Sequence, residues 1–178
     1  PESVWIDAST SRITLRDFAL TAPFGAPDEG VEGALHPDLI DALLYMAPEQ
    51  TGRMDRGVDF RSDLYSLGAT LYHSLAGGPP FEEQDPMALI HAHMARVPTS
   101  VLMRRPELPR TLSRIVDKLL QKQPEDRYQT AHALSRDLCT CRDQLQRMRE
   151  IDDDLPLGTS DAPCRPLFVK CLYGRDAE

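Results

Sequence analysis

The alternation of apolar and polar positions predicts two short strands at the start of the chain. Val4, Trp5 and Ile6 form one apolar run, and Ile13 and Leu15 alternate with polar neighbours. The segment "DAST" between these runs supplies residues that favour a turn. We therefore expect a short β-hairpin at the N-terminal end of the molecule.

A long helix is predicted from Arg61 to about Ala76, because apolar residues recur there at spacings of three and four. This stripe consists of Leu64, Leu67, Gly68, Leu71 and Leu75, and it is widened by Tyr65 and Tyr72. A helix that is apolar around most of its circumference is typical of a buried element. The segment "GGPP" that follows is expected to end the helix.

Three further helices are predicted downstream. One covers "DPMALIHAHMARV", with Asp85 as N-cap and Pro86 at the first helical position. Another covers "TLSRIVDKLLQK", with Thr111 as its cap, and the last runs from about Thr130 through "AHALSRDLCTCRDQLQRM". A short helical piece is expected at "HPDLIDALL", after a long exposed loop over 21–35. The expected fold is mainly α, a helical bundle with one short β-hairpin at its N-terminal end.

Composition and charge restrict the class of protein. The 178 residues are 41% hydrophobic, enough for a core, and 20 basic against 28 acidic residues give a net charge of −8. An acidic chain repels phosphate backbones, so we expect no nucleic-acid partner. No apolar run approaches the roughly 18 residues that span a bilayer, so we expect a cytoplasmic protein without membrane contact. The four cysteines, Cys139, Cys141, Cys164 and Cys171, fit reduced thiols.

The order of these elements, together with four short motifs, resembles the C-terminal lobe of a protein kinase. The chain contains, in this order, a strand, "RDFAL", a polar loop and "APE". These are followed by a helix with "SDLYSLG" and by three more helices through "PEDRYQTA". "APE" alone carries no weight, but "DLYSLG", "PPF" and "DRYQ" at their positions make the match specific. The resemblance covers roughly residues 1–142. Residues 143–178 are expected to form an acidic Pro/Gly linker and the start of a following domain.

The resemblance implies two structural roles. Glu49, in "APE", is expected to pair with a buried Arg127, in "EDRY", and so to hold the end of the activation segment. Asp63, at the start of the long helix, is expected to cap backbone amides of the catalytic loop. A carboxylate at a helix N-terminus is also favoured by the helix dipole, so an ordinary first-turn acid is the alternative for Asp63.

The same resemblance implies that the site for ATP and Mg²⁺ is degraded. Of the family's parts, the phosphate-covering loop, the Lys–Glu ion pair and the catalytic Asp belong to segments before Pro1, so no catalytic residue is expected within the chain. Ser3 stands where the family has a metal-binding Asn, and Asp17, Phe18 and Ala19 stand at the Asp-Phe-Gly position. A serine hydroxyl is shorter than an amide and neutral, and alanine restricts positive φ. We therefore expect a crippled or inactive kinase. The alternative for Asp17 is a loop carboxylate without metal.

The activation loop carries no Ser or Thr between Thr21 and Thr51, so phosphorylation at the usual place is not expected to switch it. Asp28, Glu29 and Glu32 either replace that charge or form a solvated acidic loop. Among the histidines, His91 and His93 are two residues apart on a helix and point to different sides, so metal binding is not expected. His73 is expected to be a packed core histidine.

Two longer stretches of the sequence indicate which subgroup of kinase-like domains the chain resembles. The sequence from "APEQTGRMDRGVDF" through "IHAHMA" is similar to the kinase-like domain that heads large signalling proteins, where AAA-type ATPase, GAF and histidine-kinase regions follow. The ending "FVKCLYGRDAE" is similar to the entry into that ATPase module. This implies intramolecular partners, namely an N-lobe and downstream ATPase and sensor domains, and it allows a protein substrate. Three hypotheses stand: a regulatory kinase-like module, which we favour; an active Ser/Thr kinase; and a helical scaffold for the ATPase domain.

Overall fold

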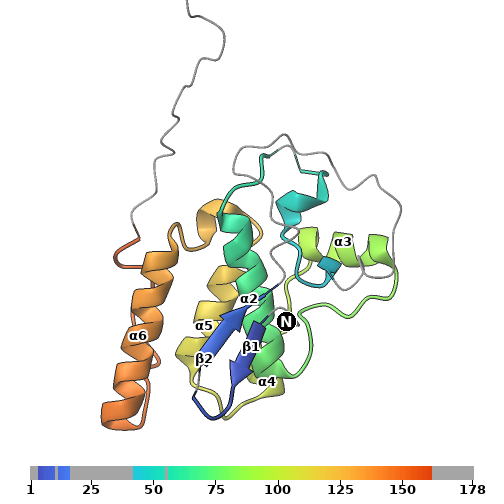
Figure 1. The fold of residues 1–178 in the computed structure, drawn as a ribbon. Coiled ribbons are helices and arrows are strands. Elements are labelled where there is room, and N and C mark those ends of the chain that lie inside the picture. The colour runs from blue at the N-terminus through green and yellow to red at the C-terminus, as the bar shows by residue number, and fades with distance from the viewer. Residues whose placement is uncertain (1–3, 11, 17–41, 55, 162–178) are drawn as a thin grey trace, which may run out of the picture.

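The computed structural model describes residues 4–10, 12–16, 42–54 and 56–161. The order of elements is a hairpin followed by helices (Figure 1). The α-helices are α2 (Arg61–Ala76), α3 (Pro86–Ala95), α4 (Val101–Arg104), α5 (Arg110–Leu119) and α6 (Ala131–Met148), and the 3₁₀ helices are η2 (Pro48–Thr51) and η3 (Pro124–Asp126). The fold is mainly α with one small hairpin, as predicted. The loop expected over 21–35 and most of the helical piece expected at "HPDLIDALL" lie outside the described residues.

The predicted hairpin is confirmed. Strands β1 (Val4–Asp7) and β2 (Arg12–Leu15) pair antiparallel, with Val4 opposite Leu15 and Asp7 opposite Arg12. The turn is held by the Asp7 carboxylate, which accepts bonds from the Ser9 amide at 2.9 Å and the Ser9 hydroxyl at 2.6 Å. These bonds, together with those from Thr10, lower the pKa of Asp7 to about 2. The apolar side chains of the hairpin are well exposed: Trp5, Ile6, Ile13 and Leu15 are 57–65% accessible.

One of the two predicted helix caps is present. Asp85 accepts a bond from the Ala88 amide at 2.8 Å, with Pro86 in the first turn of α3. Helix α6 starts after Thr130, as predicted, and the Thr130 hydroxyl caps it by accepting a bond from the Ala133 amide at 3.1 Å. The prediction that Thr111 caps α5 is wrong. Helix α5 begins at Arg110, and the Thr111 hydroxyl is turned away to donate to the carbonyl of Asp152 at 2.5 Å.

Helix α2 is the central element of the bundle, and it packs most extensively on α5. The two helices approach closely at Gly68, where a Cβ atom would lie 2.6 Å from Leu119 Cβ. One flank of α2, with Asp63, Leu67 and Ser74, is exposed in the part of the chain that the structure describes. Leu67, predicted to belong to the buried stripe, is 40% exposed there, because the apolar surface of α2 extends beyond the face that α5 can cover.

The core consists of three groups of buried side chains. One joins α5 and α6, one surrounds the buried face of α2, and one packs α3 against the chain before η2. Ile115, Leu119 and Leu120, which the periodicity places inward, are at most 3% exposed. The apolar spacing therefore found the helices and most of the residues that they bury.

A C-terminal strap, residues 149–161, returns along α6 and completes the bundle (Figure 1). It leaves α6 at Arg149, which has a positive φ of 58°, and Ile151 then enters the core with 5% exposure. Arg114 donates to the carbonyls of Asp153 at 2.7 Å and Leu155 at 3.1 Å. The strap is thus packed on the lobe, whereas the domain boundary expected at residue 142 remains a prediction.

Candidate functional site

Glu49 is almost fully buried in the short helix η2, with an exposed fraction of 1%. The local sequence builds this helix. Pro48 restricts φ at its start, the Gln50 side chain accepts a bond from the Ala47 amide at 2.9 Å, and Gly52 leaves it with a φ of 66°. The turn therefore points one carboxylate into the protein interior, where it requires a partner.

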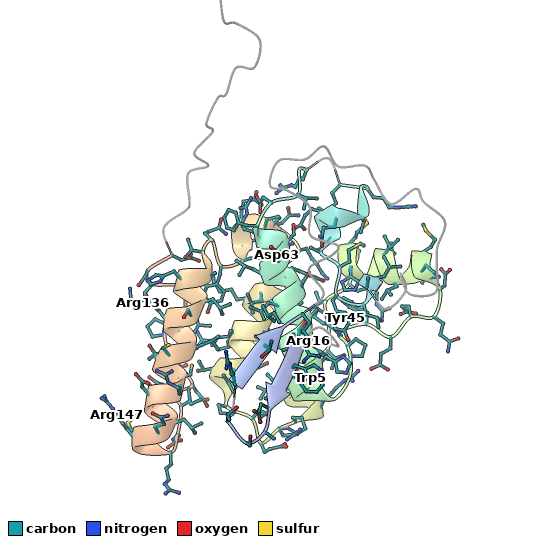
Figure 2. The ribbon with its side chains drawn as sticks, in the orientation of Figure 1. Trp5, Arg16, Tyr45, Asp63, Arg136 and Arg147 are labelled. Carbon is teal, nitrogen blue, oxygen red and sulfur yellow. The ribbon has the colours of Figure 1, made fainter. Side chains whose placement is uncertain are left out.

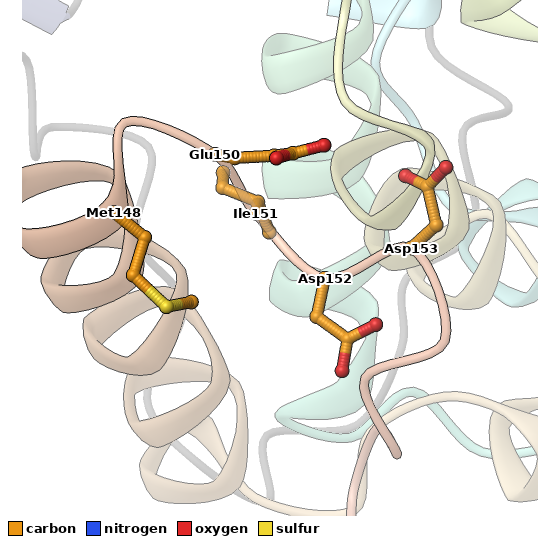
Figure 3. A pocket seen from close by; sticks show the side chains of 5 residues that line it. All are labelled: Met148, Glu150, Ile151, Asp152 and Asp153. Carbon is orange, nitrogen blue, oxygen red and sulfur yellow. The ribbon is translucent and has the colours of Figure 1, made fainter.

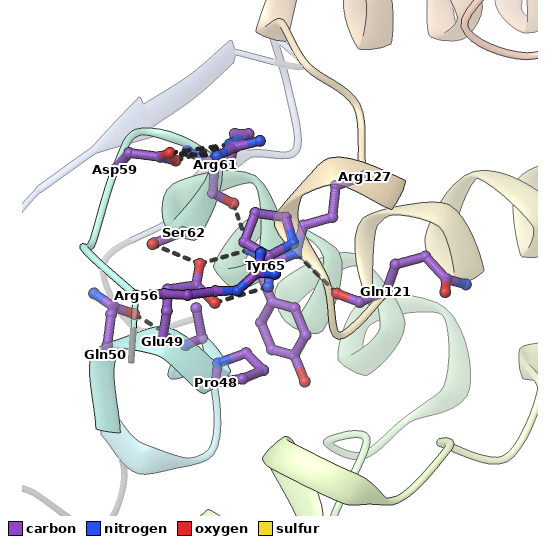
Figure 4. Close-up of polar contacts among 12 residues, drawn as sticks. Pro48, Glu49, Gln50, Arg56, Asp59, Arg61, Ser62, Tyr65, Gln121 and Arg127 are labelled. Carbon is purple, nitrogen blue, oxygen red and sulfur yellow. Dashed lines mark hydrogen bonds and ion pairs between the residues drawn. The ribbon is translucent and has the colours of Figure 1, made fainter. Parts of the chain in front are cut away.

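Arg127 is that partner. Its Nη1 and Nη2 atoms lie 2.6 and 2.8 Å from the Oε1 and Oε2 atoms of Glu49, so the pair is bidentate (Figure 4). The Ser62 hydroxyl also donates to Glu49 Oε1, at 2.7 Å. Burial alone would raise the pKa of Glu49, but the hydrogen bonds from Arg127 and Ser62 and the charge of Arg127 outweigh it, and the pKa is lowered. We call this pair the Glu49–Arg127 anchor.

The remaining donors of Arg127 bind backbone carbonyls. Nε donates to Gln121 at 2.8 Å, Nη1 to Arg61 at 3.0 Å and Nη2 to Lys122 at 3.2 Å. The guanidinium also lies over the ring of Tyr65, 4.9 Å from its centroid. One side chain thereby joins η2, the first turn of α2 and the segment after α5. The sequence predicted the ion pair but not these carbonyl contacts.

A second set of paired polar side chains lies at the first turn of α2. Arg61 forms an ion pair with Asp59, with Nη2 2.7 Å from Oδ2, and its Nη1 donates to Gln129 Oε1 at 3.0 Å (Figure 4 shows the Arg61–Asp59 pair). Burial would raise the pKa of Asp59, but the bonds from Arg61 lower it. A second ion pair, Arg61–Asp59, therefore lies next to the anchor at the start of α2.

A buried polar cluster lies beside the anchor, and sequence reasoning missed it. Tyr65 Oη and His93 Nδ1 are 2.9 Å apart, Lys122 Nζ is 3.4 Å from Tyr65 Oη, and the same Nζ lies 4.8 Å from the centroid of Phe81. Burial, reinforced by the charge of Lys122, lowers the pKa of His93 to about 4. Burial and the charge of Arg127 lower the pKa of Lys122 to about 8. His93 is therefore neutral at pH 7.

His73 was predicted to be a core histidine, but the histidine buried in the core is His93. His93 is 1% exposed, whereas His73 is only partly buried and stacks on Tyr45, with its Nδ1 2.7 Å from Tyr45 Oη. The two histidines are hard to distinguish in the sequence because each lies in the last turn of a helix rich in apolar residues.

Asp63 lies in the first turn of α2, where its side chain is exposed (Figure 2). Within the part of the chain that the structure describes, its carboxylate accepts no hydrogen bond and forms no ion pair. The role implied for it, capping amides of a catalytic loop, therefore remains a prediction. Ser3, Asp17, Phe18 and Ala19, the residues predicted for ATP and Mg²⁺, lie outside the described residues.

A surface pocket of about 340 Å³ opens at the C-terminal end of α6 (Figure 3). It is lined by Met148, Glu150, Ile151, Asp152 and Asp153 and includes no residue of the anchor. Among residues 4–10, 12–16, 42–54 and 56–161, no group of His, Cys, Asp or Glu side chains is arranged to hold a metal ion. No helix of these segments is long and apolar enough to cross a bilayer.

Comparison with known proteins agrees with this geometry. The chain is 37% identical to hybrid signal transduction histidine kinase G of Dictyostelium discoideum, over 80% of this chain and 5% of that protein. It is 36% identical to two serine/threonine-protein kinases of Mycobacterium tuberculosis: PknB, over 78% of this chain and 21% of the relative, and PknF, over 69% and 25%. The chain thus spans at most a quarter of each of these relatives' length.

The family model that matches the chain is that of the protein kinase domain, and the match covers residues 1–139. This range includes the hairpin, η2, α2 to α5 and both residues of the anchor. The bundle, the buried Glu49–Arg127 pair and the matches to known kinases together establish that the chain belongs to the protein kinase domain family.

Proposed function

We propose that this chain is the C-terminal lobe of a kinase-like module that regulates or docks neighbouring domains of a larger sensor histidine kinase and has lost efficient phosphate transfer. The observation that carries the proposal is the contrast between two sets of residues. The anchor that holds the end of the activation segment is intact, with Glu49 and Arg127 each 1% exposed. The positions that would hold Mg²⁺ have diverged from the family pattern at Ser3 and Ala19.

The chemistry of the metal donors supports reduced activity. Protein kinase domains use ATP and Mg²⁺, and when bound the metal neutralises charge on the transferred phosphate. Asp17 offers the carboxylate that Mg²⁺ prefers, so one metal ligand is kept. Ser3 offers a short neutral hydroxyl in place of a longer amide, and this weakens the second position. We infer weak nucleotide binding and slow or absent phosphate transfer.

The exposed side of α2 supports the view that the lobe works with further protein segments. Phe60, just before α2, and Leu67, in α2, are 39% and 40% exposed, and Asp63 in the first turn of α2 is exposed as well. A helix of this apolar character is normally covered on all sides. We propose that this side of α2, together with the exposed apolar residues of the hairpin, receives the catalytic loop and the N-lobe of the complete domain.

The similarity to hybrid signal transduction histidine kinase G supports a signalling histidine kinase as the parent protein. From the sequence resemblance we propose that this lobe precedes ATPase and sensor regions there and that the parent protein is cytoplasmic. An active Ser/Thr kinase is the second candidate, and the similarity to PknB and PknF favours it. A purely structural scaffold for the ATPase module is the third, and the packed strap that continues the lobe favours it.

Nucleotide binding by the complete protein tests the proposal. We expect ATP with Mg²⁺ to stabilise the wild-type protein by less than about 1 kcal/mol in a thermal-shift experiment, because the metal ligands are incomplete. The double variant Ser3→Asn, Ala19→Gly should bind more tightly. It should gain about 2.7 kcal/mol when ATP reaches a hundredfold excess over Kd.

Asp17→Ala in the restored background is the matched control and should abolish the gain. Wild-type protein that is strongly stabilised by ATP and transfers phosphate would contradict the proposal in favour of the active kinase. Absence of a gain in the restored variant would favour the scaffold.

A further inference from the structure

Asp161, at the end of the C-terminal strap, is hydrogen-bonded to Gln129 and Thr130, which follow Arg127 of the anchor closely in the sequence. The Asp161 carboxylate accepts a bond from the Gln129 amide at 2.7 Å through Oδ2 and one from the Thr130 hydroxyl at 3.2 Å through Oδ1. The Asp161 amide donates to the Gly158 carbonyl at 3.0 Å, and the Gly158 amide donates to Asp137 Oδ2 at 2.8 Å. The position of Asp161 is therefore fixed on both sides.

Gln129 connects this end of the strap to the two arginines of the anchor region. Its Nε2 donates to the carbonyls of Arg127 and Pro124, both at 2.9 Å, and of Glu125 at 3.1 Å, and its Oε1 accepts from Arg61 Nη1 at 3.0 Å. Asp161 holds the backbone of Gln129, and the side chain of Gln129 holds Arg127 and Arg61. Arg127 in turn binds both the Arg61 carbonyl and Glu49.

We propose that Asp161 and Gln129 are positioning residues for the Glu49–Arg127 anchor, so that displacement of the strap at Asp161 loosens η2. The proposal rests on the proposed function only in naming η2 as the end of an activation segment. Because residues 1–139 match the kinase domain, Asp161 lies outside the shared lobe. A displacement of the strap at Asp161 would thereby alter the activation segment without any phosphorylated residue in that segment.

Amide hydrogen exchange of the full chain tests this coupling, with Asp161→Ala as the variant. The reporters are the Gln50 amide, which donates to the Ala47 carbonyl at 3.0 Å, and the Ser62 amide, which donates to the Asp59 carbonyl at 2.9 Å. If displacement of Asp161 loosens η2 and the first turn of α2, both reporters should exchange at least roughly tenfold faster than in the wild-type protein. Amides in α6 beyond its first turn should keep their protection.

Asp153→Ala is the matched control. Asp153 lies in the same strap, and its Oδ1 accepts a bond from the Arg110 amide at 3.2 Å, at the start of α5. We expect this variant to leave the Gln50 and Ser62 amides unchanged. Equal acceleration in both variants, or uniform acceleration across the lobe in Asp161→Ala, would overturn the proposal, because the strap would then act only as a cover.

Gln129→Ala tests whether the effect of Asp161 on the anchor is transmitted through the Gln129 side chain. If the coupling runs through Gln129, Asp161→Ala should add little acceleration at the reporters once Gln129 has been replaced. Additive effects would overturn the route. The measurement needs no nucleotide and no substrate, so a negative result would leave the proposed function standing, and loss of the proposed function would leave the coupling measurable.

Discussion

All five N–H donors of the Arg127 guanidinium are used, two by Glu49 and three by backbone carbonyls. A buried charge is tolerated only when it is paired and hydrogen-bonded, so the surrounding chain must be arranged to suit this one side chain. The sequence predicted the partner only through the resemblance to the protein kinase lobe, in which "APE" and "EDRY" match known motifs. It could not predict the carbonyls of Gln121 and Lys122, which are placed by the folded backbone.

Glu49→Gln should destabilise the chain strongly. The substitution leaves the Arg127 charge buried without a compensating carboxylate, a change that costs about 3–5 kcal/mol. Glu125→Gln is the matched control, since Glu125 pairs with Arg56 at 2.6 Å but the two side chains are 57% and 42% exposed. This control should cost less than about 1 kcal/mol. Urea unfolding measures both values. Similar small losses in the two variants would mean that the anchor does not hold the lobe.

His93 should make the chain less stable as the pH falls. The pKa of the buried His93 is about 4 in the folded protein, below its ordinary value of 6.5. Between these values the unfolded chain binds the extra proton, so stability is lost as the pH falls from about 6.5 toward 4, by up to about 3 kcal/mol. The facing Tyr65 and Lys122 do not titrate in this range, since the pKa of Tyr65 is raised by burial and that of Lys122 is about 8.

The comparison of wild-type protein with His93→Phe measures this contribution. Phenylalanine fills the site without titrating, so its unfolding free energy should fall less steeply between pH 6.5 and 4. Glu49 and Asp59 contribute equally to both proteins, and the difference in slope therefore belongs to His93. Parallel profiles would show that His93 is protonated in the folded state.

At the scale of elements, the sequence was informative wherever local signals decide the outcome. Helix α2 has the predicted bounds, α3 begins after its predicted cap and α6 begins after Thr130 as predicted, because capping and periodicity act within a few residues. Thr111 was misassigned because its hydroxyl binds the carbonyl of Asp152, which is far away in the sequence. Leu67 was misassigned because its burial depends on neighbours that the described residues do not supply.

At the scale of the whole molecule, the strap is the feature that the sequence least indicated. Residues 149–161 are acidic and contain Pro and Gly, which are typical of a linker, yet Ile151, Leu155 and Leu157 pack on the α5–α6 core. Three apolar residues in an irregular segment give no periodic signal, so only the folded core reveals their role. The kinase lobe itself was predictable because its motifs are ordered along the chain. The state of its nucleotide site follows from Ser3 and Ala19 and is a prediction for the complete protein.

Phosphate transfer by the complete protein is the measurement that tests this account most directly. With radiolabelled ATP, Mg²⁺ and a generic protein substrate, the kinase-like module is expected to transfer little or no phosphate, because Ser3 stands where the resemblance implies a metal-binding amide. If the parent protein is the sensor histidine kinase proposed above, the assay uses a variant whose histidine-kinase region cannot be phosphorylated, so that this region contributes no label. Transfer to serine or threonine by the wild-type module that is lost in Asp17→Ala would contradict the account and identify an active kinase.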